Sequence, residues 1–119
     1  MKKNASEKRS SCPVACVLDL IGDKWTLLVV RDLACGKSHF NEFCQSPERI
    51  ATNILADRLD RLVASGLVEK QSPPEPAKRE VYRLTEKGQT LVPVLKTIAQ
   101  WGLDHIPGTA ARMNFIKLK

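Results

Sequence analysis

Apolar and polar residues alternate with a helical period along the segment from 50 to 63 of this 119-residue chain. The apolar residues recur every three or four positions, as on one buried side of a helix; they are Ile50, Ile54, Leu55, Leu59, Leu62 and Val63. The other side carries Thr52, Asn53, Ala56, Asp57, Asp60 and Arg61. The pattern predicts an amphipathic helix that stops at Gly66 and leaves a narrow, mostly polar face free for a partner.

Shorter helices are predicted before this segment. Pro13 suits a first helical turn, and the helix that it opens should stop at Gly22. Asp23 is expected to cap a second helix over residues 24–34. Because that helix is apolar on most sides, it should form the centre of the core. A third, short helix is expected at 40–44.

A hairpin and a last helix are predicted after the amphipathic helix. Strands are expected at V-E-K-Q and E-V-Y-R-L, and the segment 72–79 between them holds three prolines, which make a stiff, basic-tipped wing. Thr85 is a plausible cap for the last helix, in which Pro93 predicts a bend or a late start. The order of elements is that of a winged helix-turn-helix, mainly α with a small β-wing.

Length and charge narrow the possibilities further. The chain is long enough for one domain, which we place at 12–106 between a basic tail at 1–11 and a second tail at 107–119. Its formal charge of +6 favours polyanionic partners. No segment approaches roughly eighteen consecutive apolar residues, and the polar N-terminus does not resemble an export signal. We therefore expect a cytoplasmic protein without a membrane partner, associated with the nucleoid when bound to DNA.

The four cysteines, Cys12, Cys16, Cys35 and Cys44, do not predict a disulfide scaffold, because the helix content is high and no export signal is present. Only the first two form a close pair, and His39 and His105 stand alone, which argues against a zinc site. No nucleophile, base and oxyanion arrangement is visible. We therefore predict no enzyme activity, no metal and no cofactor.

Four stretches together resemble the HxlR-type winged-helix transcriptional regulators of bacteria, distant relatives of the MarR group. They are C-P-V at 12–14 with I-G-D-K-W-T-L-L-V-V-R-D-L at 21–33, F-N-E-F at 40–43, I-L-A-D-R-L-D-R-L at 54–62 followed by G-L-V, and Y-R-L-T-E-K-G at 82–88 leading to W-G at 101–102. The resemblance runs from Cys12 to about Ile106. It implies a homodimer that binds an inverted-repeat operator with one recognition helix and one wing per half-site.

The helix at 50–64 would then be the recognition helix. Asn and Thr near its start can hydrogen-bond to base edges, whereas basic residues of the wing can bind phosphates or enter the minor groove. The predicted DNA-contact set is Thr52, Asn53, Asp57, Arg58, Arg61, Lys78 and Arg79. An alternative for the two helix arginines is pairing with Asp57 and Asp60. Family members often have Ser where this chain has Ala51, so the helix lacks that side-chain cap.

The first and last helices carry more apolar surface than one small domain needs, which supports a twofold interface. The expected interface residues are Val14, Val17, Leu18, Leu91, Leu95, Ile98 and Trp101. In some relatives the cysteine of the C-P-V position senses oxidants or electrophiles, and the start of a helix favours its thiolate. We hypothesise this role for Cys12, with Cys44 of the partner subunit as the resolving thiol or Cys16 as the alternative; the other interpretation is a passive cysteine.

Two further functions stay open. A winged helix that docks a protein instead of an operator is compatible with the acidic Asp57 and Asp60 on the exposed face. A small enzyme has no sequence feature in its favour. The target genes, the direction of regulation and the signal do not follow from the sequence.

Overall fold

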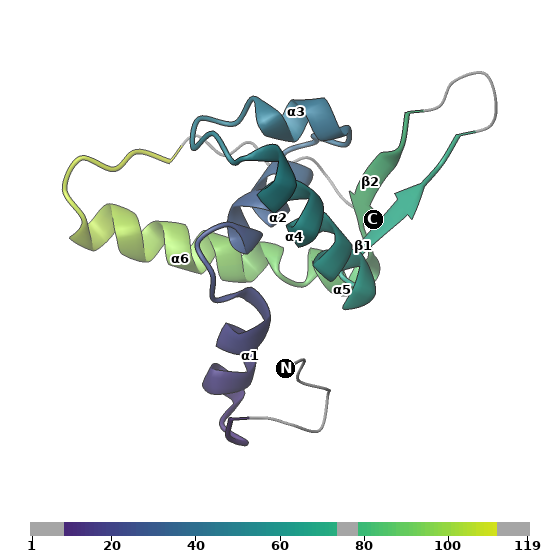
Figure 1. Cartoon of the computed structure of the whole chain (residues 1–119). Helices are drawn as coiled ribbons and strands as arrows, with labels where there is room; N and C mark the ends of the chain where they lie inside the picture. The colour runs from purple at the N-terminus through teal and green to yellow at the C-terminus, as the bar shows by residue number, and fades with distance from the viewer. Residues whose placement is uncertain (1–8, 74–78, 112–119) are drawn as a thin grey trace.

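The computed structural model describes residues 9–73 and 79–111. Its elements follow one another in the predicted order (Figure 1). They are α1 (Pro13–Ile21), α2 (Thr26–Ala34), α3 (Phe40–Cys44), α4 (Thr52–Ala64), β1 (Val68–Gln71), β2 (Val81–Leu84), α5 (Glu86–Gln89) and α6 (Val92–His105). The predicted fold class, mainly α with a two-stranded wing, is confirmed.

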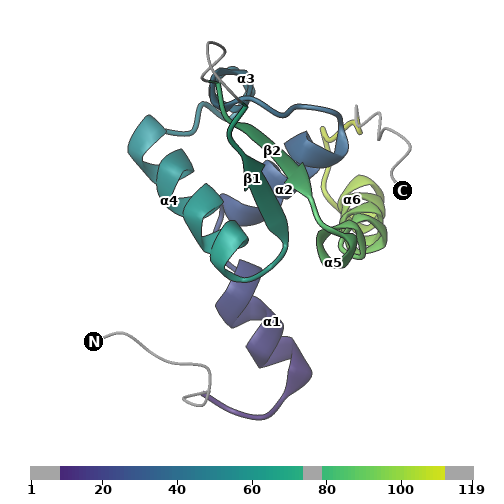
Figure 2. The same cartoon turned by 90° about the vertical axis from the view of Figure 1, so that its right-hand side faces the viewer.

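Helix α2 lies in the middle of the molecule, with α4 and the hairpin on one side and α6 beneath it (Figures 1 and 2). In both views α1 projects from this body. Helix α2 begins at Thr26, two residues later than predicted. The expected cap still forms, because the Asp23 carboxylate accepts the backbone N–H of Trp25 at 3.0 Å and of Thr26 at 3.1 Å.

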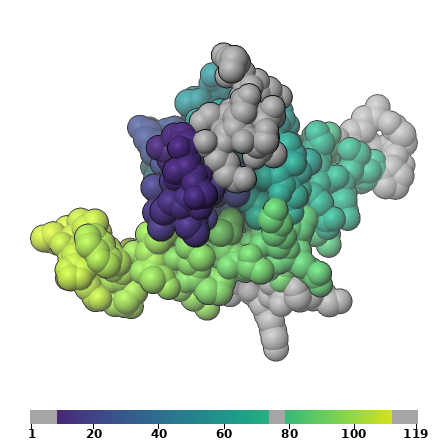
Figure 3. Space-filling view, turned by 90° about the horizontal axis from the view of Figure 1, so that it is seen from below, coloured from purple at the N-terminus to yellow at the C-terminus, as the bar shows by residue number. Residues whose placement is uncertain are grey.

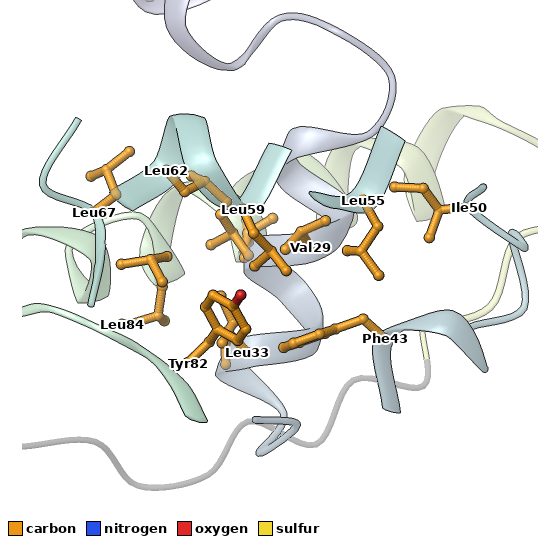
Figure 4. Close-up of a cluster of buried hydrophobic side chains, with 14 residues drawn as sticks. Val29, Leu33, Phe43, Ile50, Leu55, Leu59, Leu62, Leu67, Tyr82 and Leu84 are labelled. Atoms are coloured by element: carbon orange, nitrogen blue, oxygen red, sulfur yellow. The ribbon is translucent and has the colours of Figure 1, made fainter. Parts of the chain in front are cut away.

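The core is built around α2 and the inner side of α4 (Figure 4). Its largest fully buried side chains are Phe43, Leu55, Leu59, Leu62, Val30 and Val68. One apolar residue of α4 departs from the prediction, since Val63 is 36% exposed and does not join the buried stripe. At 100° per residue, Val63 lies about 70° from the middle of the buried stripe of Leu55, Leu59 and Leu62, at the edge of that stripe.

The two strands pair antiparallel, with Val68 opposite Leu84 and Lys70 opposite Tyr82. Tyr82 and Leu84 are buried and Arg83 is exposed, the alternation expected of a strand with one buried face. The Tyr82 ring meets the edge of Phe43 of α3, with ring centroids 6.3 Å apart. The Tyr82 N–H also donates to the Ser38 carbonyl at 2.8 Å, so the base of the wing is attached to the segment before α3.

The last predicted helix is divided into α5 and α6. Thr85 caps α5, accepting the N–H of Gly88 at 3.0 Å, and Pro93 is in the first turn of α6, so the late start that the proline predicted is confirmed. A Cβ at Gly88 would stand 2.0 Å from the carbonyl oxygen of Leu67, so only glycine allows this close approach. None of the described helices is long and apolar enough to cross a membrane.

Candidate nucleic-acid interface

The outer face of α4 is polar and accessible. Thr52, Asn53, Asp57, Asp60 and Arg61 are all exposed, as the helical period predicted. Ala51 occupies the N-cap position and makes no side-chain cap, also as expected. The helix therefore offers its N-terminal turn, with a partial positive charge from the peptide dipoles, beside the side chains of Thr52 and Asn53.

Arg58 does not share this face. Its Nε donates to Asp23 Oδ2 at 2.8 Å, its Nη1 pairs with Asp57, and its side chain is only 17% exposed. Pairing with acids, the alternative interpretation, therefore describes Arg58 in this structure, and its contact with DNA stays a prediction. The main partner, however, is Asp23, which lies 35 positions away in the sequence and was not foreseen.

Arg61 stays accessible although it is paired. Its Nε lies 3.0 Å from Asp57 Oδ2, one helical turn earlier, and its side chain is 62% exposed. An exposed pair of this kind contributes only about 0.3–0.5 kcal/mol, so a phosphate can replace the carboxylate at little cost. Arg61 is thus the helix arginine that the structure leaves available to a polyanion.

Polar contacts also anchor the loop that leads into α4. The Arg31 guanidinium holds both carboxylate oxygens of Glu48 at 2.8 Å, and the Ser46 hydroxyl donates to the buried Asp32. The hydrogen bond from Arg31 lowers the pKa of Glu48. Arg49 next to it adopts a φ of 57°, a conformation that a non-glycine residue rarely takes and that these anchors hold in place. No local sequence signal connects residues so far apart, and sequence reasoning missed this set.

The wing contributes one described basic residue near its tip. Arg79 is exposed, and its Nη2 donates to Asn41 Oδ1 at 3.2 Å, which brings the wing close to α3. Lys70 and Glu80 pair across the hairpin at 3.5 Å. The predicted contact at Lys78 lies outside the described residues.

Helices α1 and α6 both expose large apolar side chains, and both are visible on the face seen in Figure 3. Five expected interface residues are exposed: Val14 (66%), Val17 (47%), Leu18 (54%), Ile98 (50%) and Trp101 (61%). Leu20, Leu103 and Ile106 extend the surface and were not foreseen. Leu95 is buried and Leu91 packs against the core, so both serve their own protomer instead.

All four cysteines are free thiols. Cys12 is exposed at the N-cap of α1, and the Cys16 thiol donates to the Ser10 carbonyl at 3.4 Å. Cys35 and Cys44 are half-buried. Helices α1 and α3, which follow Cys12 and end at Cys44 respectively, lie at opposite ends of the molecule (Figures 1 and 2). Among residues 9–73 and 79–111, no three His, Cys, Asp or Glu side chains gather as metal ligands would.

Comparison with known proteins gives a consistent result. Residues 20–110 match the family model described as HxlR-like helix-turn-helix. The HTH-type transcriptional regulator YybR of Bacillus subtilis (strain 168) is 35% identical over 101 residues, which are 85% of this chain and 81% of YybR. The crystal structure of PA1607, a putative transcription factor, has a TM-score of 0.75 and 44% identity, covering 95% of this chain and 77% of PA1607. The redox regulator HypR in its reduced form has a TM-score of 0.74 and 33% identity, covering 80% of this chain and 94% of HypR.

Proposed function

Since the chain belongs to the HxlR-like helix-turn-helix family, we propose that it binds an inverted-repeat operator as a homodimer. It is a transcriptional regulator of the helix-turn-helix type, and its curated relatives are regulators, not enzymes. The observation that carries the proposal is the two-sided character of α4: Leu55, Leu59 and Leu62 are buried, whereas its opposite side is polar and exposed. A helix of this width fits the major groove.

Four exposed residues have a role in this proposal. Asn53 reads an adenine through its amide, and Thr52 contacts a neighbouring base or phosphate. Arg61 leaves Asp57 and neutralises a phosphate. Arg79 approaches the backbone or minor groove from the wing.

Fluorescence anisotropy with the DNA upstream of the gene tests operator binding, in rising salt and against excess unrelated duplex. We expect tight binding that survives the competitor. Asn53→Ala should weaken it by about 1–3 kcal/mol, and Arg61→Gln should reduce the salt slope by about one unit. Gln100→Ala, on α6, is the control and should bind like the parent. The proposal would be contradicted if the upstream DNA bound only weakly and the competitor abolished that binding, and if duplexes selected from a random library behaved in the same way.

The homodimer is supported by the apolar side chains that α1 and α6 expose. Burial of Trp101, 61% exposed in the single chain, would contribute substantially to such an interface. Trp101→Glu should therefore yield a monomer in sedimentation velocity, because the interface cannot solvate the charge. Gln100→Glu adds the same charge about 100° around the helix and should remain dimeric. A Trp101→Glu protein that stays dimeric would exclude α6 from the interface.

We further propose that oxidants act on the regulator through Cys12. The residue is exposed at the N-cap of α1, and HypR, a similar structure, is described as a redox regulator. Diamide would take two electrons and two protons from Cys12 and from Cys44 of the partner subunit, joining them in a disulfide. Diamide should change operator affinity in the parent and in Cys35→Ser but not in Cys12→Ser. An unchanged affinity in the parent would refute this role.

The exposed Asp57 and Asp60 favour a second candidate function, docking of a basic protein surface. Arg61→Glu separates the two functions, because a DNA reader loses its operator while a docking module has no operator to lose.

A further inference from the structure

Asp23 is held rigidly at the junction between α1 and α2. Gly22 ends α1, and the next residue places its carboxylate over the first turn of α2. One oxygen accepts the N–H groups of Trp25 and Thr26, and the other accepts the Thr26 hydroxyl. The side chain is only 27% exposed. Three donors at the start of α2, from Trp25 and Thr26, thus fix the direction in which the carboxylate points.

Arg58 of α4 reaches the same carboxylate. Its Nε donates to Asp23 Oδ2 at 2.8 Å, while its Nη1 is paired with Asp57 on its own helix. Arg58 comes five residues after Asn53, so it points about 140° around the helix from Asn53. The guanidinium therefore joins the α1–α2 junction, through Asp23, to Asp57 at the edge of the polar face of α4.

The electrostatics agree with this geometry. Partial burial alone would raise the pKa of Asp23, but the hydrogen bonds from Thr26, Arg58 and the Trp25 N–H together hold it well below its ordinary value. The pKa of Arg58 is raised, mainly by its hydrogen bond to Asp23. Both groups therefore stay charged over the neutral range.

We propose that the Asp23–Arg58 pair is a positioning clamp that sets the angle of α4 relative to α2 and to the turn from which α1 leaves, and thereby the operator half-site spacing that the dimer accepts. This rests on the proposed operator-binding function. The apolar contacts between α2 and α4 are not directional, whereas a charge-assisted hydrogen bond is. In Figures 1 and 2, α1 leaves the body beneath α4, so the clamp is located between the proposed dimer helix and the recognition helix. The separation of two recognition helices determines the spacing of half-sites.

The test uses full-length dimer and the duplex that the wild type enriches from a random library, with the half-site spacer changed by one and two base pairs. Arg58→Gln and Asp23→Asn should lower affinity for the best duplex about tenfold, as expected for loss of a charge-assisted hydrogen bond between partly exposed groups. Binding to the altered spacers should fall less, so that the preference for one spacing flattens. The double variant should be no worse than either single variant.

Two controls separate a clamp from other roles. The salt slope should stay that of the wild type, because a lost phosphate contact would reduce it by about one unit. Arg9→Gln removes one positive charge from an exposed ion pair with Asp19 and should keep the spacing preference. Asp23→Asn retains an oxygen that can cap α2, and Arg58→Lys retains the positive charge. If Arg58→Gln does not fold, either of these variants can therefore distinguish a positioning clamp from a phosphate contact.

The outcomes are distinct. An equal loss of affinity at every spacing, or wild-type preference in the variants, overturns the clamp and leaves operator binding intact. A reduced salt slope for Arg58→Gln also overturns it, in favour of a phosphate contact. A wild type that enriches no duplex overturns both the clamp and the proposed function.

Discussion

Replacing Ala51 by Ser should stabilise the protein, although it adds one hydroxyl at an exposed position. Ala51 is the N-cap of α4, with φ −65° and ψ 145°, the extended backbone that a capping serine adopts. Its own carbonyl already accepts the Leu55 N–H at 2.9 Å. No side chain caps the first turn, so the N–H groups of Asn53 and Ile54 lack the partner that a serine Oγ would supply.

The size of the effect follows from this geometry. A serine cap in place of alanine contributes about 0.5–2 kcal/mol, and typically about 1. The lower half of that range applies here, because the N-terminus of α4 is exposed and water already solvates its donors. For a chain of 119 residues, an unfolding entropy of about 2 cal/mol/K per residue converts 1 kcal/mol into about 4 °C. We expect a rise of about 2–4 °C in Tm.

Urea and thermal unfolding, followed by circular dichroism at one fixed protein concentration, measure the change. Ala56→Ser is the matched control, since it makes the same chemical change at an exposed position in the middle of α4. There serine is a poorer helix former than alanine, and stability should fall by about 0.5 kcal/mol. The reasoning is refuted if Ala51→Ser leaves the urea midpoint unchanged or lowers it, or if both substitutions act in the same direction.

Two further substitutions have clear expected outcomes. Gly88→Ala should lower the free energy of unfolding by about 1–3 kcal/mol or more. Its Cβ would stand 2.0 Å from the carbonyl oxygen of Leu67, and this backbone atom cannot move away easily. The control is Gly102→Ala, whose Cβ would have nothing within 4 Å and which should be neutral or slightly stabilising in the same urea titration. Asp23→Asn should reduce the loss of stability as the pH falls below about 4. The pKa of Asp23 in the folded chain lies below its ordinary 3.8, so in this pH range the unfolded chain takes up a proton that the folded chain does not. The wild type therefore loses the stability that the charged carboxylate contributes, whereas the variant never had that contribution. An equally steep acid limb in the variant would show that the Asp23 carboxylate does not contribute.

The local elements of this protein could be predicted from the sequence because their causes are local. The period of α4, the glycine after it, the alternation of Tyr82 and Leu84, and the missing cap at Ala51 each depend on residues within one or two turns. Pro93 likewise predicted the late start of α6, since a proline removes one backbone donor wherever it stands. The polar face of α4 was therefore identified before the fold was known.

Contacts between distant residues were decided only by the tertiary structure. Leu95 and Ile98 belong to the same helical stripe, yet the position of α6 against α2 buries the first and leaves the second 50% exposed. Arg58 has acids beside it in the sequence, but the packing of α4 on α2 brings it to Asp23. Periodicity gives the direction of a side chain from its own helix axis, whereas its partner depends on how two helices pack, and many pairs of residues contribute to that arrangement.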